Sequence, residues 1–470
     1  MLKVDYADWQ VYPRKNCRRV QSACVQAAAL FGSELWWKGD NAHGMVGRRE
    51  EIQKLVNQEA RATTGAFRTT NQGALSLESG IKPAVVQLDN RLRRFALRLA
   101  SLPRGDQARE LVGSTDCALG QRIQSALGCW NGGEKTVLLE VASPLDASAT
   151  IEEEAAAALE ARRLDRPGLS IFTDGSRLEN GATGYAVAWK KGASWKGHKT
   201  HMGWGQEAFD AECAAIARAL QVSATRNHVV GTVTIFTDAQ AAIWRMTSDD
   251  PGLGQKYALE ARRHIAALRA KGPNVKIEIR WCPSHQGIEW DKLAADEPDA
   301  HGVEWFSTTN PDGSVSARKF PLPRSLANVK RGFSEQKRED ASNWAKRQLA
   351  RTRNRKYRPD EKKPDQTVAK AKKRLASRFY QKTGHCLTGQ YLAWTTRRPD
   401  ATCWWCQYKI QTREHLFKNC PQWKSQQKTL WATVLVETTR KLPGPTRSRD
   451  WTNTVELLAD QRCSQAVLEM

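Results

Sequence analysis

Hydrophobic and polar positions between residues 168 and 305 follow the periods of both strands and helices. Runs rich in β-branched and aromatic residues predict five strands, over residues 169–174, 183–190, 194–202, 232–237 and 275–281. Apolar residues recur at helical spacing over residues 207–222, 239–247 and 254–271, and the loop after residue 281 leads into a further helix. The strands cluster first and then alternate with helices. This order predicts an α/β domain, a mixed five-stranded sheet with flanking helices.

Two of the predicted strands carry the same four residues, Ile171-Phe172-Thr173-Asp174 and Ile235-Phe236-Thr237-Asp238. If the strands are parallel neighbours, their ends place two carboxylates side by side, where ligand sites of α/β sheets lie. Close like charges repel unless a cation joins them, and Mg²⁺ prefers oxygen ligands. Taken singly, Asp174 would suit a turn and Asp238 a helix N-cap.

A third carboxylate, Glu212, lies between the two aspartates in the sequence, on an Ala-rich predicted helix. Its neighbours Cys213, Ile216 and Leu220 are apolar, so Glu212 borders the buried stripe of that helix. A carboxylate there costs free energy unless a partner compensates it. The three residues together therefore favour a metal site over three separate structural roles.

This arrangement resembles the type 1 ribonuclease H domain over about residues 168–303. The resemblance is carried by four ordered motifs: Thr173-Asp174-Gly175-Ser176, Asp210-Ala211-Glu212-Cys213, Thr237-Asp238 and Trp281-Cys282-Pro283-Ser284-His285-Gln286-Gly287. It implies hydrolysis of the RNA strand of RNA–DNA hybrids with two Mg²⁺ ions, which Mn²⁺ can replace. Asp174 would bridge the ions, Glu212 and Asp238 would each hold one, and His285 would assist proton transfer or product release. Gly175 and Ser176 would sense the 2′-hydroxyl.

The last carboxylate of the family pattern is displaced in this chain. Gly287-Ile288-Glu289 is followed directly by Trp290, where the family has Gly-Asn-Glu-x-Ala-Asp. Asp291 and Asp296 are the candidates for this role, and we favour Asp296 because it follows Ala295 as in the family. The alternative function is a degenerate remnant that only binds nucleic acid.

Residues 1–140 read as helical, with apolar stripes over residues 19–35, 48–64 and 89–102. The segment resembles the region after the polymerase palm in fungal non-LTR retrotransposon reverse transcriptases, where it would be thumb and connection. The matching text runs from Arg19 to Trp37 and from Ala60 to Leu75. Tyr6-Ala7-Asp8-Trp9 lacks the second aspartate of a polymerase box, so we expect no polymerase activity from this chain.

The formal charge of +23 and the pI of about 9.7 indicate a polyanionic partner, and we expect RNA–DNA hybrid and RNA. Basic residues are densest at 351–356 and 370–374, within a segment over residues 306–374 that we assign to basic linker and helices. Such clusters also suit a solvated face or a nuclear localisation signal. The 18 tryptophans, among them Trp36-Trp37 and Trp404-Trp405, suit either core positions or platforms that stack bases.

A cysteine and histidine cluster near the C-terminus, Cys403-x2-Cys406-x8-His415-x4-Cys420, has the spacing of a structural zinc site. Buried unpaired cysteines are the alternative. His385 and Cys386, in the Gly384-His385-Cys386-Leu387-Thr388-Gly389 stretch, are competing ligands. The segment also resembles the zinc-binding region of the same retroelement proteins, where it would grip RNA or DNA.

We expect no secretion signal and no membrane span, because residues 1–9 lack an apolar region and the longest apolar run, near residues 25–31, is short. The 11 cysteines then belong in a reducing compartment, the nucleus or cytoplasm. The expected organisation has six parts. They are a helical region (1–140), an exposed helical linker (141–167), the ribonuclease H-like domain (168–305), the basic segment (306–374), the zinc segment (375–430) and a helical tail (431–470).

Overall fold

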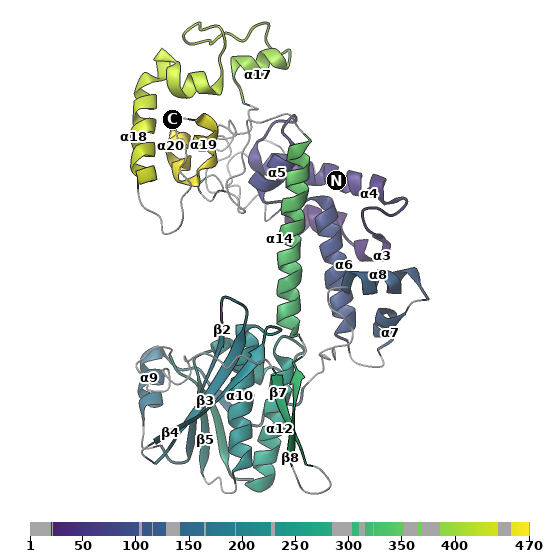
Figure 1. Cartoon of the computed structure of the whole chain (residues 1–470), viewed down its shortest axis with the longest axis vertical. Coiled ribbons are helices and arrows are strands. Elements are labelled where there is room, and N and C mark those ends of the chain that lie inside the picture. The colour runs from purple at the N-terminus through teal and green to yellow at the C-terminus, as the bar shows by residue number, and fades with distance from the viewer. Residues whose placement is uncertain are drawn as a thin grey trace. The chain divides into compact units, whose positions relative to one another are not determined.

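The computed structural model describes most of the chain, and Figure 1 shows its elements. The described residues are 20, 22–102, 106–114, 116–127, 142–163, 166–192, 194–226, 231–283, 303–309, 315–322, 324–351, 365, 367, 386–439 and 453–469. The chain divides into two compact units. One contains residues 93–334, and the other contains residues 1–92 together with 335–470.

A six-stranded mixed sheet forms the centre of the 93–334 unit, in the order β1-β6-β5-β2-β3-β4. Its strands are β1 (Ser148–Thr150), β2 (Leu169–Arg177), β3 (Thr183–Lys191), β4 (Ser194–Gly203), β5 (Thr232–Thr237) and β6 (Lys276–Trp281). β2, β5, β6 and β1 pair in parallel, whereas β2, β3 and β4 pair antiparallel. The mixed α/β sheet predicted from the sequence is confirmed, but the predicted number of five strands was wrong, because β1 adds a sixth strand at the edge.

Both faces of the sheet are covered by other parts of the chain. Alternate residues of each strand point to opposite faces, so each strand contributes side chains to both. On one face Ile171 and Ile235 join the core with α10 (Ala208–Thr225), α11 (Gln240–Thr247) and α12 (Gln255–Lys271). On the other face the rings of Phe172 and Phe236 stack with centroids 4.9 Å apart. In each repeat, therefore, the isoleucine packs in the core on one face of the sheet and the phenylalanine packs in the core on the other face.

The strand β1 and the helix α9 (Glu154–Arg162) lie where the sequence analysis placed an exposed linker. β1 adds to the edge of the sheet beside β6. Ala157, Ala158 and Ala161 of α9 are buried, and Ala161 belongs to the cluster of Phe172 and Phe236. The expectation of an exposed segment was wrong, because small alanines let the helix lie close to other parts of the chain.

Two further strands, β7 (Val303–Thr309) and β8 (Val315–Pro321), form an antiparallel pair that the sequence analysis missed. They precede α14 (Leu326–Ala350), a 25-residue helix within the segment assigned to basic linker and helices. The first turns of α14 belong to the 93–334 unit, where Leu326, Val329 and Phe333 are buried. They pack in a cluster with Leu97, Ile123 and other residues of α6 (Ala84–Ala100), α7 (Gln107–Gly113) and α8 (Ala118–Leu127).

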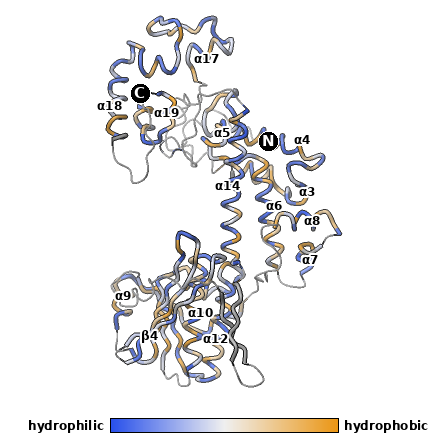
Figure 2. The backbone as a smooth tube through the Cα atoms, viewed as in Figure 1, coloured by the Kyte–Doolittle hydropathy of each residue, from blue (hydrophilic) through white to orange (hydrophobic). Residues whose placement is uncertain are grey.

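The other unit begins with helices. They are η2 (Ser22–Gln26), α2 (Ala27–Ala29), α3 (Ser33–Trp36), α4 (Met45–Thr64), α5 (Gln72–Ser79) and the first part of α6. Figure 2 shows hydrophobic and hydrophilic residues alternating along α6. A single helix over residues 19–35 was the wrong prediction, since the chain breaks at Gly32, whose φ of 65° is left-handed.

Trp37 is fully buried, and its indole N–H donates a 2.7 Å hydrogen bond to Asp89. It is therefore a core residue of this unit. The sequence allowed Trp37 to be either a core residue or a platform that stacks bases. Its burial shows that it is a core residue.

The described residues after 386, in the C-terminal part of the same unit, form seven elements. They are α17 (Gly389–Trp394), η4 (His415–Asn419), η5 (Pro421–Trp423), α18 (Lys424–Thr439), α19 (Thr454–Ala459), η6 (Gln461–Cys463) and α20 (Ser464–Glu469). Phe417 packs with Leu430, Val434, Leu457 and Val467. The zinc segment and the predicted tail thus share one core.

No helix among the described residues is long and apolar enough to cross a lipid bilayer. The faint polymerase-like Tyr6-Ala7-Asp8-Trp9 and the basic clusters after residue 351 lie outside the described residues.

Candidate functional site

The parallel pairing of β2 with β5 brings Asp174 and Asp238 together. The last parallel pair joins Thr173 to Thr237, so each aspartate follows directly after it. β2 itself continues to Arg177 by pairing with β3, where Asp174 is opposite Ala186. The predicted end of this strand at Asp174 was therefore three residues too early. Ala239, not Asp238, is the N-cap residue of α11, so Asp238 does not have the helix-capping role considered from the sequence.

Glu212 completes the group from α10, which passes against β2 at Gly175. A Cβ atom at Gly175 would lie 2.4 Å from the backbone nitrogen of Glu212, so only glycine fits between strand and helix. One carboxylate oxygen from each of Asp174, Glu212 and Asp238 lies within 4.8 Å of the others. The three carboxylates that the sequence motifs indicated therefore lie close together in the structure. Ser176 is exposed beside them.

The electrostatics of this group suit a cation. Burial, followed by the negative charges of Asp238 and Asp174, raises the pKa of Glu212 to about 9, and a backbone hydrogen bond from Gly175 offsets part of the increase. Oε2 of Glu212 is buried without a hydrogen-bond partner. An unpartnered carboxylate oxygen on one of three neighbouring carboxylates fits a hard divalent cation such as Mg²⁺, which would replace the proton.

The raised pKa of Glu212 predicts how stability depends on pH when no metal is present. The folded chain holds a proton that the unfolded chain releases near pH 4.5, so stability falls as pH rises from about 4.5 to 9. The slope approaches about 1.4 kcal/mol per pH unit. Glu212→Gln should flatten this dependence in EDTA, as measured by thermal unfolding at pH 5 and pH 8.5. An unchanged slope would contradict the shift.

The other residues assigned to this site from the sequence were His285, Asp291 and Asp296, and all three lie outside the described residues. The loop that leads toward them starts at the end of β6. The indole N–H of Trp281 donates a 3.0 Å hydrogen bond to the backbone carbonyl of Asp238. The backbone N–H of Cys282 donates a 2.9 Å hydrogen bond to the carbonyl of Thr237. The strand that precedes His285 is therefore attached directly beside the carboxylates.

A second group of four metal-ligand side chains lies in the C-terminal segment. One ligand atom from each of Cys403, Cys406, His415 and Cys420 lies within 4.8 Å of the others. The sulfurs of Cys403 and Cys420 are 3.9 Å apart, and tetrahedral zinc with 2.3 Å bonds sets sulfurs about 3.8 Å apart. Cys406 Sγ lies 3.2 Å from Nε2 of His415. The donor set and its spacing fit Zn²⁺.

The surroundings of this group also suit a metal. Although burial acts in the opposite direction, backbone N–H groups of Cys406 and Trp405 lower the pKa of Cys403 to about 6. Burial raises the pKa of Cys420 to about 11. The Nε2–H of the fully buried Gln411 donates to Cys403 Sγ at 3.4 Å, and its Oε1 accepts from the backbone N–H of Gly389. Hydrogen bonds of this kind orient metal-binding sulfurs.

Of the two competing ligands, Cys386 is buried but does not belong to the four-residue group, and His385 lies outside the described residues. Gly389, from the same stretch, lies where a Cβ atom would be 2.5 Å from the carbonyl oxygen of Ala401. The stretch therefore supports the cysteine group through close packing.

Sequence reasoning missed Gln411 and a polar network around Glu207 and Asp210 at the start of α10. The Glu207-x-x-Asp210 spacing before an Ala-rich run was an available signal, because helix capping boxes have this spacing. Nothing in the sequence around Gln411 indicated its role.

The fold was compared with those of solved structures. The chain is similar to the N-terminal RNase H domain of rv2228c from Mycobacterium tuberculosis, solved as a fusion with maltose-binding protein. The identity is 19%, the match covers 28% of this chain and 98% of that chain, and the TM-score is 0.22. No family model matches the chain, and no curated protein matches it.

Proposed function

We propose that the 93–334 unit is a metal-dependent nuclease that hydrolyses the RNA strand of RNA–DNA hybrids. The observation that carries the proposal is the gathering of Asp174, Glu212 and Asp238 around one point, with Oε2 of Glu212 unpartnered. The four ordered sequence motifs and the charge of +23 support the same activity and a nucleic-acid substrate. We further propose that the chain descends from a fungal non-LTR retrotransposon protein. The resemblance of residues 19–37 and 60–75 to that family supports this origin.

In the proposed mechanism Asp174, Glu212 and Asp238 would hold two divalent cations, and Asp174 would be a ligand of both. When bound, these ions activate water and stabilise the leaving oxygen. Ser176 and the backbone at Gly175 contact the 2′-hydroxyl, which distinguishes RNA from DNA. His285 would assist proton transfer or product release, and Asp296 would supply a fourth carboxylate.

The direct test uses a hybrid whose RNA strand is labelled, incubated with the full chain in Mg²⁺. We expect cleavage of the RNA strand in the hybrid and none in matched RNA–RNA or DNA–DNA duplexes. Binding of all three without cleavage would favour the alternative, a degenerate protein that only binds nucleic acid.

We also propose that the C-terminal segment holds one structural zinc ion and contacts single-stranded nucleic acid. Trp404 and Trp405 are 37% and 40% exposed, with ring centroids 5.1 Å apart. The guanidinium of Arg398 lies 5.2 Å from the Trp404 ring. Adjacent exposed rings with a cation over one of them suit base stacking and a phosphate contact.

Trp404→Ala should therefore weaken binding of single-stranded RNA about tenfold, since base–aromatic stacking contributes about 1–3 kcal/mol per base. Fluorescence anisotropy with a labelled oligonucleotide measures this change. Leu435→Ala is the control, because Leu435 is an exposed apolar residue on α18, outside the group of tryptophans. Equal affinity of the parent and Trp404→Ala would exclude the stacking role.

A further inference from the structure

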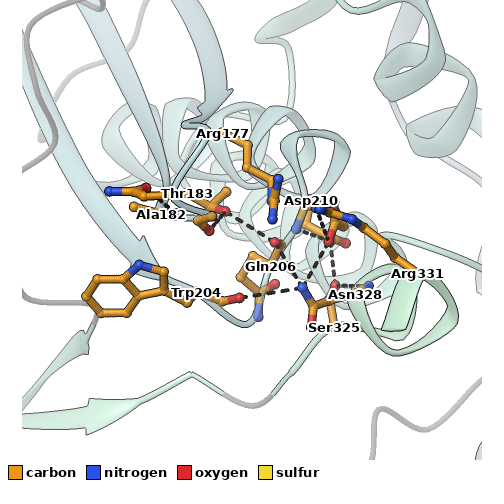
Figure 3. Close-up of polar contacts among 12 residues, drawn as sticks. Arg177, Ala182, Thr183, Trp204, Gln206, Asp210, Ser325, Asn328 and Arg331 are labelled. Carbon is orange, nitrogen blue, oxygen red and sulfur yellow. Dashed lines mark hydrogen bonds and ion pairs between the residues drawn. The ribbon is translucent and has the colours of Figure 1, made fainter. Parts of the chain in front are cut away.

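The residues at the start of α14 contact the helix that carries Glu212, as Figure 3 shows. The Ser325 hydroxyl donates a 2.5 Å hydrogen bond to Oδ2 of Asp210. The backbone N–H of Ser325 donates to the carbonyl of Gly205 at 2.8 Å. Asp210 is 1% exposed, so this contact lies in the interior.

Asn328 contacts the same end of α10 one turn further along α14. Its Nδ2 donates a 2.9 Å hydrogen bond to Oε1 of Glu207, and it also reaches the carbonyl oxygens of Trp204 and Gln206 at 3.5 Å. Its Oδ1 accepts a hydrogen bond from Nε of Arg324 at 2.9 Å. Both polar ends of a buried amide are thus satisfied.

Glu207 links three elements. It is the N-cap residue of α10 and exchanges capping-box hydrogen bonds with Asp210. Its carboxylate also lies 3.2 Å from Arg331 of α14 and 3.5 Å from Arg177, the last residue of β2. β2 is the strand that carries Asp174, so one carboxylate joins the strand of Asp174, the helix of Glu212 and α14.

The position of α10 along β2 determines how Glu212 lies relative to Asp174 and Asp238. Glu212 is five residues after Glu207 on one rigid helix, about 7.5 Å along its axis. The helix backbone also touches β2 at Gly175, so a small shift of α10 moves Glu212 relative to Asp174. Misplacement by about 1 Å in a catalytic group costs about 100-fold in rate.

We propose that Ser325, Asn328 and Arg331 are positioning residues, which hold the N-terminus of α10 so that Glu212 meets Asp174 and Asp238. The proposal rests on the proposed nuclease function of that site. It extends the functional domain past residue 305, because the sheet and α10 by themselves lack these contacts.

The test compares Ser325→Ala and Asn328→Ala with the parent chain at a temperature well below unfolding. Each should lower kcat for hybrid cleavage and raise the Mg²⁺ concentration for half-maximal activity about tenfold, which is typical when residues supporting metal ligands are removed. KM for the hybrid should stay within about twofold, because substrate contacts are unchanged. Ser325→Thr keeps the hydroxyl and should restore most of the activity.

Val329→Ala is the matched control. Val329 lies on the same turns of α14 and is 2% exposed, but it packs in the apolar cluster of α6 and α8. It should lower Tm and leave the Mg²⁺ requirement unchanged. If Ser325→Ala and Asn328→Ala behave in this way too, their role is structural and the proposal is overturned.

A separate readout distinguishes failure of this proposal from failure of the nuclease proposal. Mg²⁺ should raise the Tm of the parent, and this increase should be smaller in Asn328→Ala at equal Mg²⁺. A parent that neither cleaves hybrid nor gains Tm with Mg²⁺ overturns the nuclease function, and the positioning role with it.

Discussion

Asp174→Asn is expected to lower cleavage of RNA–DNA hybrids at least about 1000-fold. In the proposed mechanism Asp174 would be a ligand of both ions. A metal ion contributes several kcal/mol of transition-state stabilisation, and each 1.36 kcal/mol equals tenfold in rate. The amide keeps the shape of the side chain but removes the charge that holds the cations. Initial rates in 10-fold steps of Mg²⁺ concentration measure the effect.

Glu179→Gln is the matched control for this variant. Glu179 is an exposed carboxylate five residues further along the chain, in the turn between β2 and β3. Glu179→Gln should cleave the hybrid at the parental rate. A rate for Asp174→Asn close to that of Glu179→Gln would remove the three-carboxylate group from the mechanism.

Cys406→Ser is expected to release the zinc ion and unfold the segment around it. Structural zinc contributes about 10–16 kcal/mol of apparent binding free energy, which is folding free energy for such a segment. The Cys406 sulfur lies 3.2 Å from Nε2 of His415 and belongs to the group of four ligands. Removal of this sulfur leaves three ligands. Metal analysis of the full chain should give about one zinc per parent molecule and none for the variant.

Cys386→Ser separates the two possible ligand sets. Cys386 is a buried cysteine outside the four-residue group, so its serine variant should keep the zinc ion. Loss of zinc from Cys386→Ser with retention in Cys406→Ser would reverse the assignment.

The sequence predicted the central sheet well because its signals are local and strong. The observed bounds of β2, β3, β4 and β5 lie within three residues of the predicted strands. Runs of β-branched and aromatic residues mark β2 and β5 most clearly. The ends of these strands also predicted where Asp174 and Asp238 meet. Glu212 followed from a carboxylate at the edge of an apolar helical stripe.

The parts that the sequence missed depend on contacts between residues far apart in the chain. The Ser325 hydrogen bond to Asp210 spans 115 residues, and neither residue type signals such a pairing. β1 is three residues long and exists through its pairing with β6. The break in the first helix arises from the left-handed conformation of Gly32, whereas the apolar spacing continues through it.

The most direct test of the central claim is to locate divalent cations in crystals of the full chain soaked in Mn²⁺, by anomalous diffraction at the manganese edge. We expect two peaks about 4 Å apart, in contact with Asp174, Glu212 and Asp238. In crystals of Asp174→Asn both peaks should be lost. Manganese bound elsewhere on the parent chain, with none at these three carboxylates, would contradict the account.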